Sequence, residues 1–413
     1  MIRITNGYSF YSLVLILSNT KMLNRRILRL KAMQALYALE QAQRSNYQLA
    51  LDYIHQKFEP NLNSMVIPTA EEVAQKRKLG KELFEANYQN ESLEAKSEKE
   101  HADVDIVVSE AMRIYTTQIQ KERRFQKQEM VKKTEGIHDD YLKLLKLLMA
   151  LADHSEADYN SRKARQYSQE VVFESELHFT NNALIKHLVG HQELRELLIG
   201  SNWATENIKH WFKLLKEEEF YKNYLSIKKP TFLEDKEFII TLTRDFIMQN
   251  DVLDSYFYEN DIYWSENRSV LRNMLLKTVK NIEEENILTN TPVELYLLSR
   301  NWEDDKEFFE ELFQNTVNES LKNEKLISDR LKNWDITRVA LTDTLILKMA
   351  ISEMMHCPSI PVKVSINEYV ELAKNYSTPK SKEFVNGILD TLSEHLVSEG
   401  LIKKSGRGLL DNQ

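Results

Sequence analysis

The chain has 413 residues, a formal net charge of −8 and a composition that is 42% hydrophobic and 29% charged. These values are typical of an ordinary globular protein, and the single cysteine, Cys357, excludes an intrachain disulfide and predicts a reducing compartment, the cytoplasm. Nine glycines and seven prolines leave few residues for turns, and no stretch shows the sustained apolar/polar alternation of a half-buried strand. The sequence therefore predicts an all-α fold.

An apolar stretch, "YSFYSLVLIL", occupies residues 8–17. A membrane-spanning helix needs about 20 residues, and no small-residue cleavage site follows the stretch. We therefore expect no membrane segment and interpret residues 1–21 as an N-terminal extension, with Met22 as the effective start. A secretory signal is the alternative.

The segment "KMLNRRILRLKAMQALYALEQ", residues 21–41, predicts a helix from about Asn24 to about Arg44, because apolar residues recur at spacings of three and four. Cations crowd its front; they include Arg25, Arg26, Arg29 and Lys31. A cation near the positive end of a helix dipole costs about 0.3–1 kcal/mol. An outside anion, such as the phosphate backbone of RNA, would offset this cost. The alternative is a solvated helix start, or cations that pair with acidic residues elsewhere in the chain.

The next part of the chain is highly charged. Two prolines within residues 60–70 interrupt the helical pattern, and residues 71–135 interleave charges of both signs, as in a solvated helix. Its basic part is "KERRFQKQEMVKK", residues 121–133. Either this part is a solvated helix face, or a second strip of RNA contacts is formed by Arg123, Arg124, Phe125 and Lys127. Helical periodicity then resumes and continues to a predicted boundary near residue 230.

A possible internal repeat follows, with an offset of 70 residues. The tetrapeptide "DKEF" occurs at 235–238 and again at 305–308. The other matched pairs are Trp264 with Trp334, Arg268 with Arg338, Leu271 with Leu341, and Leu275 with Leu345. Chance similarity between amphipathic helices is the alternative. In either case each copy reads as a helix pair that must bury its apolar face against others.

The last segment predicts three helices between about residues 335 and 396. Ser365 and Glu368 have the spacing of a capping box at the start of the second helix, and Thr378-Pro379 fits the N-cap and first position of the third. The tail from Ser405 is expected to be loose.

No catalytic pattern is present in the sequence. It has no glycine-rich phosphate loop, no nucleophile elbow and no cysteine pair for a metal. His187 and His191 stand four residues apart, but no acidic or cysteine partner lies at a metal-motif spacing, so we interpret them as structural or surface residues. We expect no enzyme activity, no metal and no cofactor.

The chain resembles the NusB family of transcription antitermination factors at both ends. "RRILRLKAMQALYALE" at 25–40 is similar to the family's opening helix, an Arg-rich start that leads into Gln-Ala-Leu-Tyr. "IPVKVSINEYVELAKNYSTPKSKEFVNGILD" at 360–390 is the more specific match. The matching positions there are Pro361, Lys363, Val364, Ile366, Asn367, Glu368, Glu371, Leu372, Ala373, Lys374, Ser381, Phe384, Val385, Asn386, Gly387, Leu389 and Asp390. The resemblance covers about residues 22–44 and 304–395 and leaves 45–300 unexplained.

This resemblance implies a NusB-like helical bundle enlarged by a long helical insertion. The expected parts are an extension at 1–21, an N-terminal helical region at 22–230, a C-terminal NusB-like domain at 231–400 and a flexible tail at 401–413. In such a bundle, Gly387 lies within a helix, where its missing Cβ would let another helix approach.

The resemblance also implies a non-catalytic factor of ribosomal RNA transcription. Its partners would be single-stranded boxA-type RNA, the small-subunit ribosomal protein NusE and, indirectly, the RNA polymerase elongation complex. The RNA-binding residues would be Arg25, Arg26, Arg29, Lys31, Lys380, Lys382 and Phe384, which form one continuous positive strip if the two chain ends meet. The family often has an acidic residue where this chain has Lys380 and a basic one where it has Glu383, and Phe384 is equally well interpreted as a core residue.

Two other functions remain open from the sequence. One is the RNA-binding part of an rRNA methyltransferase system, since such enzymes carry a NusB-like domain. The other is a helical interaction scaffold in ribosome assembly, with the long insert as its protein-binding part.

Overall fold

The computed structural model describes residues 23–60, 68–88, 102–164, 173–197, 199, 203–331 and 336–412. The predicted N-terminal extension, with its apolar stretch, lies outside these residues, as does Trp334 of the possible repeat. Throughout the described ranges the regular elements are helices and none is a strand, which confirms the all-α prediction. None of the described helices combines the length and the hydropathy that are needed to cross a bilayer.

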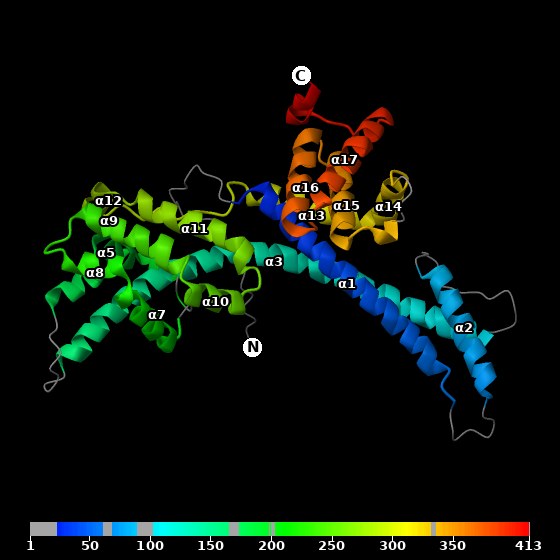
Figure 1. The fold of residues 1–413 in the computed structure, drawn as a ribbon, viewed down its shortest axis with the longest axis horizontal. Helices are drawn as coiled ribbons and strands as arrows, with labels where there is room; N and C mark the ends of the chain where they lie inside the picture. Colours follow the sequence, from blue (N-terminus) through cyan, green and yellow to red (C-terminus); the bar gives the residue numbers. More distant parts are fainter. Residues whose placement is uncertain are drawn as a thin grey trace, which may run out of the picture. The chain divides into compact units, whose positions relative to one another are not determined.

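The chain divides into two compact units, which are drawn together in Figure 1. Unit 2 is made of Arg25–Thr134 and Glu303–Gln413, and unit 1 includes Glu135–Trp302 together with the described residues before Arg25. The long helix α3 (Ala102–Lys163) contributes its first part to unit 2 and the remainder to unit 1.

The other helices of unit 2 lie at the two ends of the sequence. They are α1 (Arg25–Lys57), α2 (Ala70–Asn87), α13 (Trp302–Asn318), α14 (Ser320–Ser328), η3 (Ile336–Arg338), α15 (Leu341–His356), α16 (Val362–Tyr376), α17 (Ser381–Ser398) and η4 (Gly406–Asn412). The helices that match the NusB pattern, α1 and α15–α17, are therefore in the same unit although about 300 residues separate them. The two segments that resemble NusB in sequence are thus part of one helical unit, and the helices between them form a helical insertion.

Unit 1 holds the middle of the chain. After α3 its elements are η1 (Glu174–Leu177), α4 (His178–Asn181), α5 (Ala183–Gly190), α6 (Gln192–Leu197), α7 (Thr205–Glu217), α8 (Glu219–Ser226), α9 (Phe232–Thr241), the π-helical η2 (Leu242–Ile247), α10 (Asp251–Asn260), α11 (Trp264–Asn281) and α12 (Glu284–Leu288). The Tyr141 hydroxyl of α3, fully buried, is hydrogen-bonded to the Thr278 hydroxyl of α11 at 2.6 Å.

The boundary predicted near residue 230 falls inside unit 1 instead of between units. Tyr224 of α8 stacks on Phe238 of α9, with ring centroids 4.0 Å apart, and its hydroxyl donates to Asp235 Oδ1 at 2.6 Å. A hydrogen bond and an aromatic stack thus join the two sides of the expected boundary. The order of charged and apolar residues along the chain does not reveal this packing between α8 and α9.

The two "DKEF" copies occupy comparable positions in their own units. Asp235 and Asp305 are both buried, and so are Phe238 and Phe308. Asp235 Oδ2 accepts from the backbone N–H of Ala183, in the first turn of α5, at 2.7 Å, whereas Asp305 Oδ1 lies 3.7 Å from Arg25 Nε, in the first turn of α1. Each aspartate therefore faces the start of another helix. The internal repeat stays a prediction that this similarity supports.

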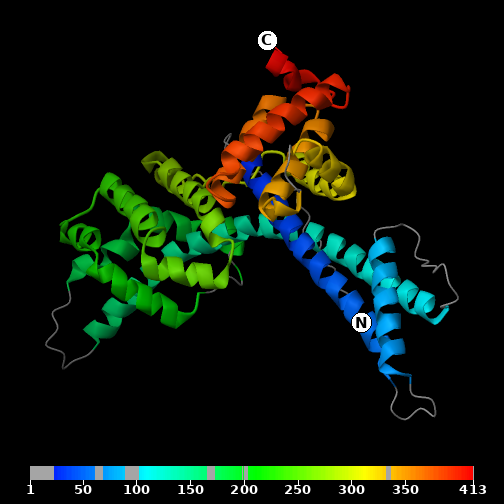
Figure 2. The same ribbon diagram turned by 45° about the vertical axis from the view of Figure 1, so that its right-hand side comes forward.

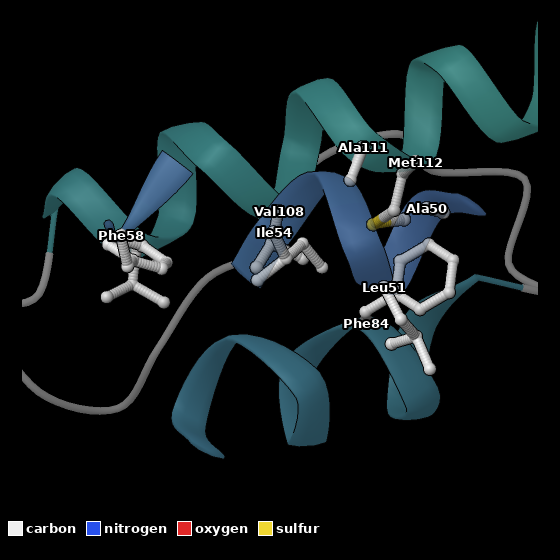
Figure 3. Packing of buried hydrophobic residues seen from close by; sticks show 9 residues of the cluster. Ala50, Leu51, Ile54, Phe58, Phe84, Val108, Ala111 and Met112 are labelled. Carbon is white, nitrogen blue, oxygen red and sulfur yellow. The ribbon is translucent and has the colours of Figure 1, made fainter. Parts of the chain in front are cut away.

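The helix α1 is longer than the sequence predicted, because its apolar face continues past Arg44. Ala50, Leu51 and Ile54 are buried against α2 and the first part of α3, as Figure 3 shows. The cluster also contains Phe58, Phe84, Val104, Val108, Ala111 and Met112. In Figure 2, α1, α2 and the first part of α3 appear in blue to cyan and lie together within unit 2. The insertion thus starts as an extension of the first NusB-like helix.

The ends of the last helices differ from the predicted caps. Helix α16 begins at Val362, so Ser365 lies inside it and its hydroxyl donates to Glu353 instead of to a backbone cap. Helix α17 begins at Ser381, three residues after Thr378. Gly387 lies within α17 as expected, but a Cβ there would meet no heavy atom within 4 Å, so no close helix contact requires this glycine.

The tail after α17, which the sequence predicts to be loose, makes hydrogen bonds to another part of unit 2. The backbone N–H of Ser405 donates to the Pro358 carbonyl at 3.0 Å, and Lys404 Nζ donates to the Cys357 carbonyl at 3.0 Å. A Cβ on Gly408 would overlap the Pro358 carbonyl oxygen. The tail is thereby fastened to the corner between α15 and α16.

Candidate nucleic-acid interface

Arg29 of α1 is buried and paired. Its side chain is 3% exposed, Nε donates to Glu353 Oε2 at 2.6 Å, and Nη2 donates to Glu353 Oε1 at 2.7 Å. The guanidinium carbon also lies 5.4 Å from the centroid of the Phe308 ring and 5.8 Å from that of Tyr369. A guanidinium in this fork geometry matches a carboxylate on two bonds, so Arg29 is held by α15 and is turned away from solvent.

The Glu353 carboxylate accepts four hydrogen bonds. Two come from Arg29, one comes from Ser365 Oγ at 2.7 Å, and one comes from the Tyr369 hydroxyl at 2.9 Å. A carboxylate has about four lone-pair sites, so its acceptor capacity is filled although it is fully buried. Burial, reinforced by the Glu353 charge, raises the pKa of Tyr369 well above its usual value. The Tyr369 hydroxyl therefore remains a donor at neutral pH.

Arg29 remains charged in this setting. Burial lowers the pKa of Arg29, but the hydrogen bonds and charge of Glu353 more than compensate, so its pKa is raised overall. Lys31, two residues later, is also 3% exposed. The prediction that Arg29 and Lys31 contact RNA is therefore corrected, because both side chains are covered by protein. Arg29 instead fixes the position of α1 on α15 and α16.

Arg25 and Arg26 remain accessible but face carboxylates of unit 2. Arg26 is 49% exposed and donates from Nε and Nη2 to the two carboxylate oxygens of Glu368, at 2.9 and 2.8 Å. The hydrogen bond from Arg26 lowers the pKa of Glu368, and Arg29, 3.6 Å away, contributes to this shift. Arg25 lies between Asp305 and the Phe308 ring, whose centroid is 4.7 Å from its guanidinium carbon.

These contacts explain how a helix can begin with three arginines. Arg25, Arg26 and Arg29 face Asp305, Glu368 and Glu353, respectively, and all six residues belong to unit 2. The carboxylates offset the unfavourable position of the cations at the positive end of the helix dipole. Pairing with acidic residues of the chain, the alternative to an outside anion, is therefore the one that the structure supports.

The two lysines at the start of α17 are arranged differently. Lys380 and Lys382 are exposed, and no carboxylate in the described part of the chain lies within ion-pair distance of either. Between them, Ser381 is buried, and its hydroxyl donates to Asp343 Oδ2 at 2.7 Å, which fixes the start of α17 against α15. Phe384, one turn later, is half-buried. The start of α17 is thus a rigid corner with two exposed cations.

The two groups of cations belong to the same unit and lie near opposite ends of α15. Arg29 is bonded to Glu353, in the last turn of α15, whereas the lysines flank Ser381, which is bonded to Asp343 in the first turn. Ten residues separate these two positions, about 15 Å at 1.5 Å per residue. The carboxylate of Glu368 also covers part of the arginine group. The continuous strip was predicted from charges in the sequence, which do not show where the carboxylates lie.

Sequence reasoning missed the acidic half of this arrangement. Glu353 was not singled out, although it is the only acidic residue in the apolar run "LILKMAISEMM", residues 345–355. A lone carboxylate in such a run predicts a buried cationic partner, because an unpaired buried charge is costly. Glu368 was assigned to a helix cap and in fact bonds Arg26. His187, in unit 1, is buried, and among the described residues no group of three candidate ligands could hold a metal.

Comparisons of the sequence with known proteins assign the chain to a family. The model of the NusB family matches residues 265–394, which begin at α11 in unit 1 and continue through most of α17 in unit 2, without α1. The "Transcription antitermination protein NusB" of Chloroherpeton thalassium is 41% identical over 106 residues, 26% of this chain and 50% of that protein. The protein of the same name from Salinibacter ruber is 39% identical over 105 residues, 25% of this chain and 66% of that protein.

A third relative is matched over nearly its whole length. The "Transcription antitermination protein NusB" of Bacillus velezensis is 33% identical over 131 residues, which are 32% of this chain and 98% of that protein. Among solved structures, NusB of T. maritima aligns with 22% identity and a TM-score of 0.22, over 41% of this chain and 93% of that one. The match thus spans half of the first relative and nearly all of the third. This chain belongs to the NusB family.

Proposed function

We propose that this protein is a non-catalytic transcription antitermination factor that binds boxA-type single-stranded RNA together with the ribosomal protein NusE. The observation that carries the proposal is the match over 98% of the Bacillus velezensis protein, whose name states transcription antitermination. A match of that extent includes nearly the whole of a smaller relative. The residues of this chain outside the match are then additions to a NusB-like factor and do not replace any large part of it.

The start of α17 supplies the principal RNA contacts in this proposal. Lys380 and Lys382 are exposed cations on a corner that Ser381 holds in place, so phosphates can approach them without a rearrangement of the backbone. Phe384 keeps part of its ring accessible and can stack on a base. The lysines provide charge, and the ring provides a contact that salt does not screen.

Arg25 and Arg26 contribute secondary contacts. A guanidinium has five N–H donors, and the carboxylate of Glu368 uses two of those of Arg26. The remaining donors of this half-exposed side chain can bond a phosphate while the ion pair persists. Arg29 acts indirectly, because it is buried and positions α1 through Glu353, and Lys31 is buried as well.

Binding measurements with purified components test the proposal. The full chain, with and without NusE, is titrated with a labelled single-stranded RNA that contains a boxA element and with a second RNA of the same composition in shuffled order. We expect tighter binding of the boxA RNA, and a further gain when NusE is present. Equal affinity for the two RNAs with no effect of NusE would contradict the proposal. Binding of NusE alone, without RNA, would favour the scaffold function.

A further inference from the structure

The first part of α3 carries a face that is rich in exposed cations. Arg113, Lys121, Arg124 and Lys132 are all exposed. At about 100° per residue, these four positions fall within about 100° of arc on one side of the helix. They extend over 19 residues, or about 28 Å along the axis. The face belongs to unit 2 and lies within the insertion that the NusB resemblance leaves unexplained.

Between residues 113 and 132 this face contains no carboxylate, and Glu110 and Glu135 lie on the same side of the helix just beyond its two ends. The other polar residues on it, Thr117, Gln120 and Gln128, are exposed and uncharged, while Glu122 and Glu129 point roughly to the opposite side. Lys132 reaches around to Glu129, at 3.7 Å, and both groups are at the surface. In the described ranges of the chain, no carboxylate lies within ion-pair distance of Arg113, Lys121 or Arg124.

Other cations of the same helix are engaged, which separates them from this face. Lys127 Nζ lies 3.7 Å from Glu310 of α13, and Arg123 is half-buried. The RNA strip considered from the sequence, 123–127, therefore contains two residues that the structure turns toward protein. Arg124 and Phe125 remain, and the helical periodicity joins them to cations farther along α3.

Two exposed apolar side chains border the cations. Ile114 is 43% exposed and Phe125 is 54% exposed, and both lie at the same edge of the face. Exposed aromatic rings beside cations are typical of single-stranded nucleic-acid surfaces, where the cations bind phosphates and the rings stack on bases. In a chain with a net charge of −8, a concentration of cations of which three have no carboxylate within ion-pair distance in the described ranges predicts a polyanionic partner.

We propose that the α3 basic face, defined by Arg113, Lys121, Arg124 and Lys132 with Phe125 at its edge, binds the backbone of single-stranded RNA. It forms a second contact region beyond the start of α17. This inference rests on the proposed function, since it assigns a further RNA-binding surface to the same factor. Binding there is independent of base identity, because phosphate contacts carry no sequence information.

A triple variant tests the α3 basic face in the full-length chain. Lys121→Gln, Arg124→Gln and Lys132→Gln remove three of its cations. The control triple, Lys78→Gln, Lys81→Gln and Lys209→Gln, removes the same charge from exposed lysines that face glutamates. The affinity for an unstructured oligouridine of about 24 nucleotides is measured at several salt concentrations. A plot of log affinity against log salt concentration has a negative slope, and each lost phosphate contact reduces the magnitude of that slope by about 0.7. We therefore expect the triple variant to reduce the magnitude by about 2.

Phe125→Ala gives an independent readout, with Leu49→Ala as its control on another exposed apolar residue. We expect Phe125→Ala to weaken RNA binding about fivefold or more with an unchanged salt slope, because stacking is not an ionic contact. If the parent chain binds RNA and the basic-face triple matches its control, the inference is wrong and the proposed function stands. If the parent chain binds no RNA, both fail. Loss of binding to anionic lipid vesicles, with RNA binding unchanged, also overturns the inference.

Discussion

The guanidinium of Arg29 and the carboxylate of Glu353 form a buried two-bond ion pair that links the first NusB-like helix to the closing three-helix segment across more than 300 residues of sequence. Ser365 and Tyr369 complete the coordination of the carboxylate from α16. Part of the basic start of α1 therefore has a structural role, because Arg29 links helices within unit 2. The RNA-binding part of the proposal accordingly depends on the exposed lysines of α17.

Removal of one partner of the buried pair should strongly destabilise the protein. Arg29→Met leaves the Glu353 charge buried and uncompensated, and we expect the free energy of unfolding to fall by about 3–5 kcal/mol. The double variant Arg29→Met/Glu353→Gln should recover part of this loss, because no buried charge remains and the glutamine still accepts a hydrogen bond. Urea unfolding of the full chain measures both. An Arg29→Met variant as stable as Arg26→Met, which alters an exposed pair worth about 0–1 kcal/mol, would refute the role of the pair.

The pair of Arg26 and Glu368 should make stability depend on pH in a known direction. The pKa of Glu368 is lowered in the folded state, mainly by its hydrogen bond from Arg26. Its contribution is thus fully present above the unfolded pKa of about 4.3 and is lost as the pH falls through the folded value. Glu368→Gln should cost stability at pH 7, and its difference from the parent chain should shrink below pH 4. A difference that stays constant from pH 7 to pH 3.5 would show that the pair contributes nothing.

Substitution of Gly408 should release the C-terminal tail. A side chain there overlaps the Pro358 carbonyl oxygen, so Gly408→Ala should loosen residues 401–412 from the corner after α15. Cys357 lies at this corner, and burial raises the pKa of its thiol to about 12. We expect the variant thiol to react faster with a disulfide reagent at pH 8 than the parent thiol does. Because Cys357 is the only cysteine of the sequence, the reaction reports on this site alone. An unchanged rate would mean that the tail does not protect it.

Gly387→Ala should increase the stability of the protein. The position lies within α17 and a Cβ there would meet no heavy atom within 4 Å. Alanine should therefore stabilise the helix by about 0.5–1 kcal/mol, through the conformational entropy that glycine loses on folding. The urea midpoint should rise with an unchanged slope. A lower midpoint would indicate that another helix packs against this position, as the resemblance to the family implies.

The sequence was sufficient for the helical class and for the NusB-like segment near the C-terminus, because helical periodicity and the "INEYVELAK" and "FVNGILD" motifs are local features. It was insufficient for the division into units, since α1 and α15–α17 join across an insertion whose own packing depends on contacts such as Tyr224 with Phe238. Charge was visible in Arg29, but its burial was not. The sequence alone does not distinguish an arginine that contacts RNA from one that pairs with a buried glutamate. The tertiary structure determines which contact is made.

The same limitation applies to caps and the tail. Ser365 and Glu368 have capping-box spacing, yet both face side chains from other helices, Glu353 and Arg26. Residues 401–412 appear loose by composition and are fastened through backbone groups, which the sequence does not distinguish. Long-range contacts therefore overrode the local signals at these positions.

The most direct measurement is the salt-dependent affinity of the full chain, with NusE, for boxA RNA after Lys380→Gln and Lys382→Gln, compared with the control Lys78→Gln and Lys81→Gln. If the start of α17 binds phosphates, the variant with Lys380→Gln and Lys382→Gln should bind boxA RNA more weakly. The magnitude of its salt slope should be smaller by about 1.4, because two contacts are lost. Its thermal unfolding should be unchanged, since both lysines are exposed. Equal affinity and slope in the two variants would contradict this assignment of the RNA-binding surface.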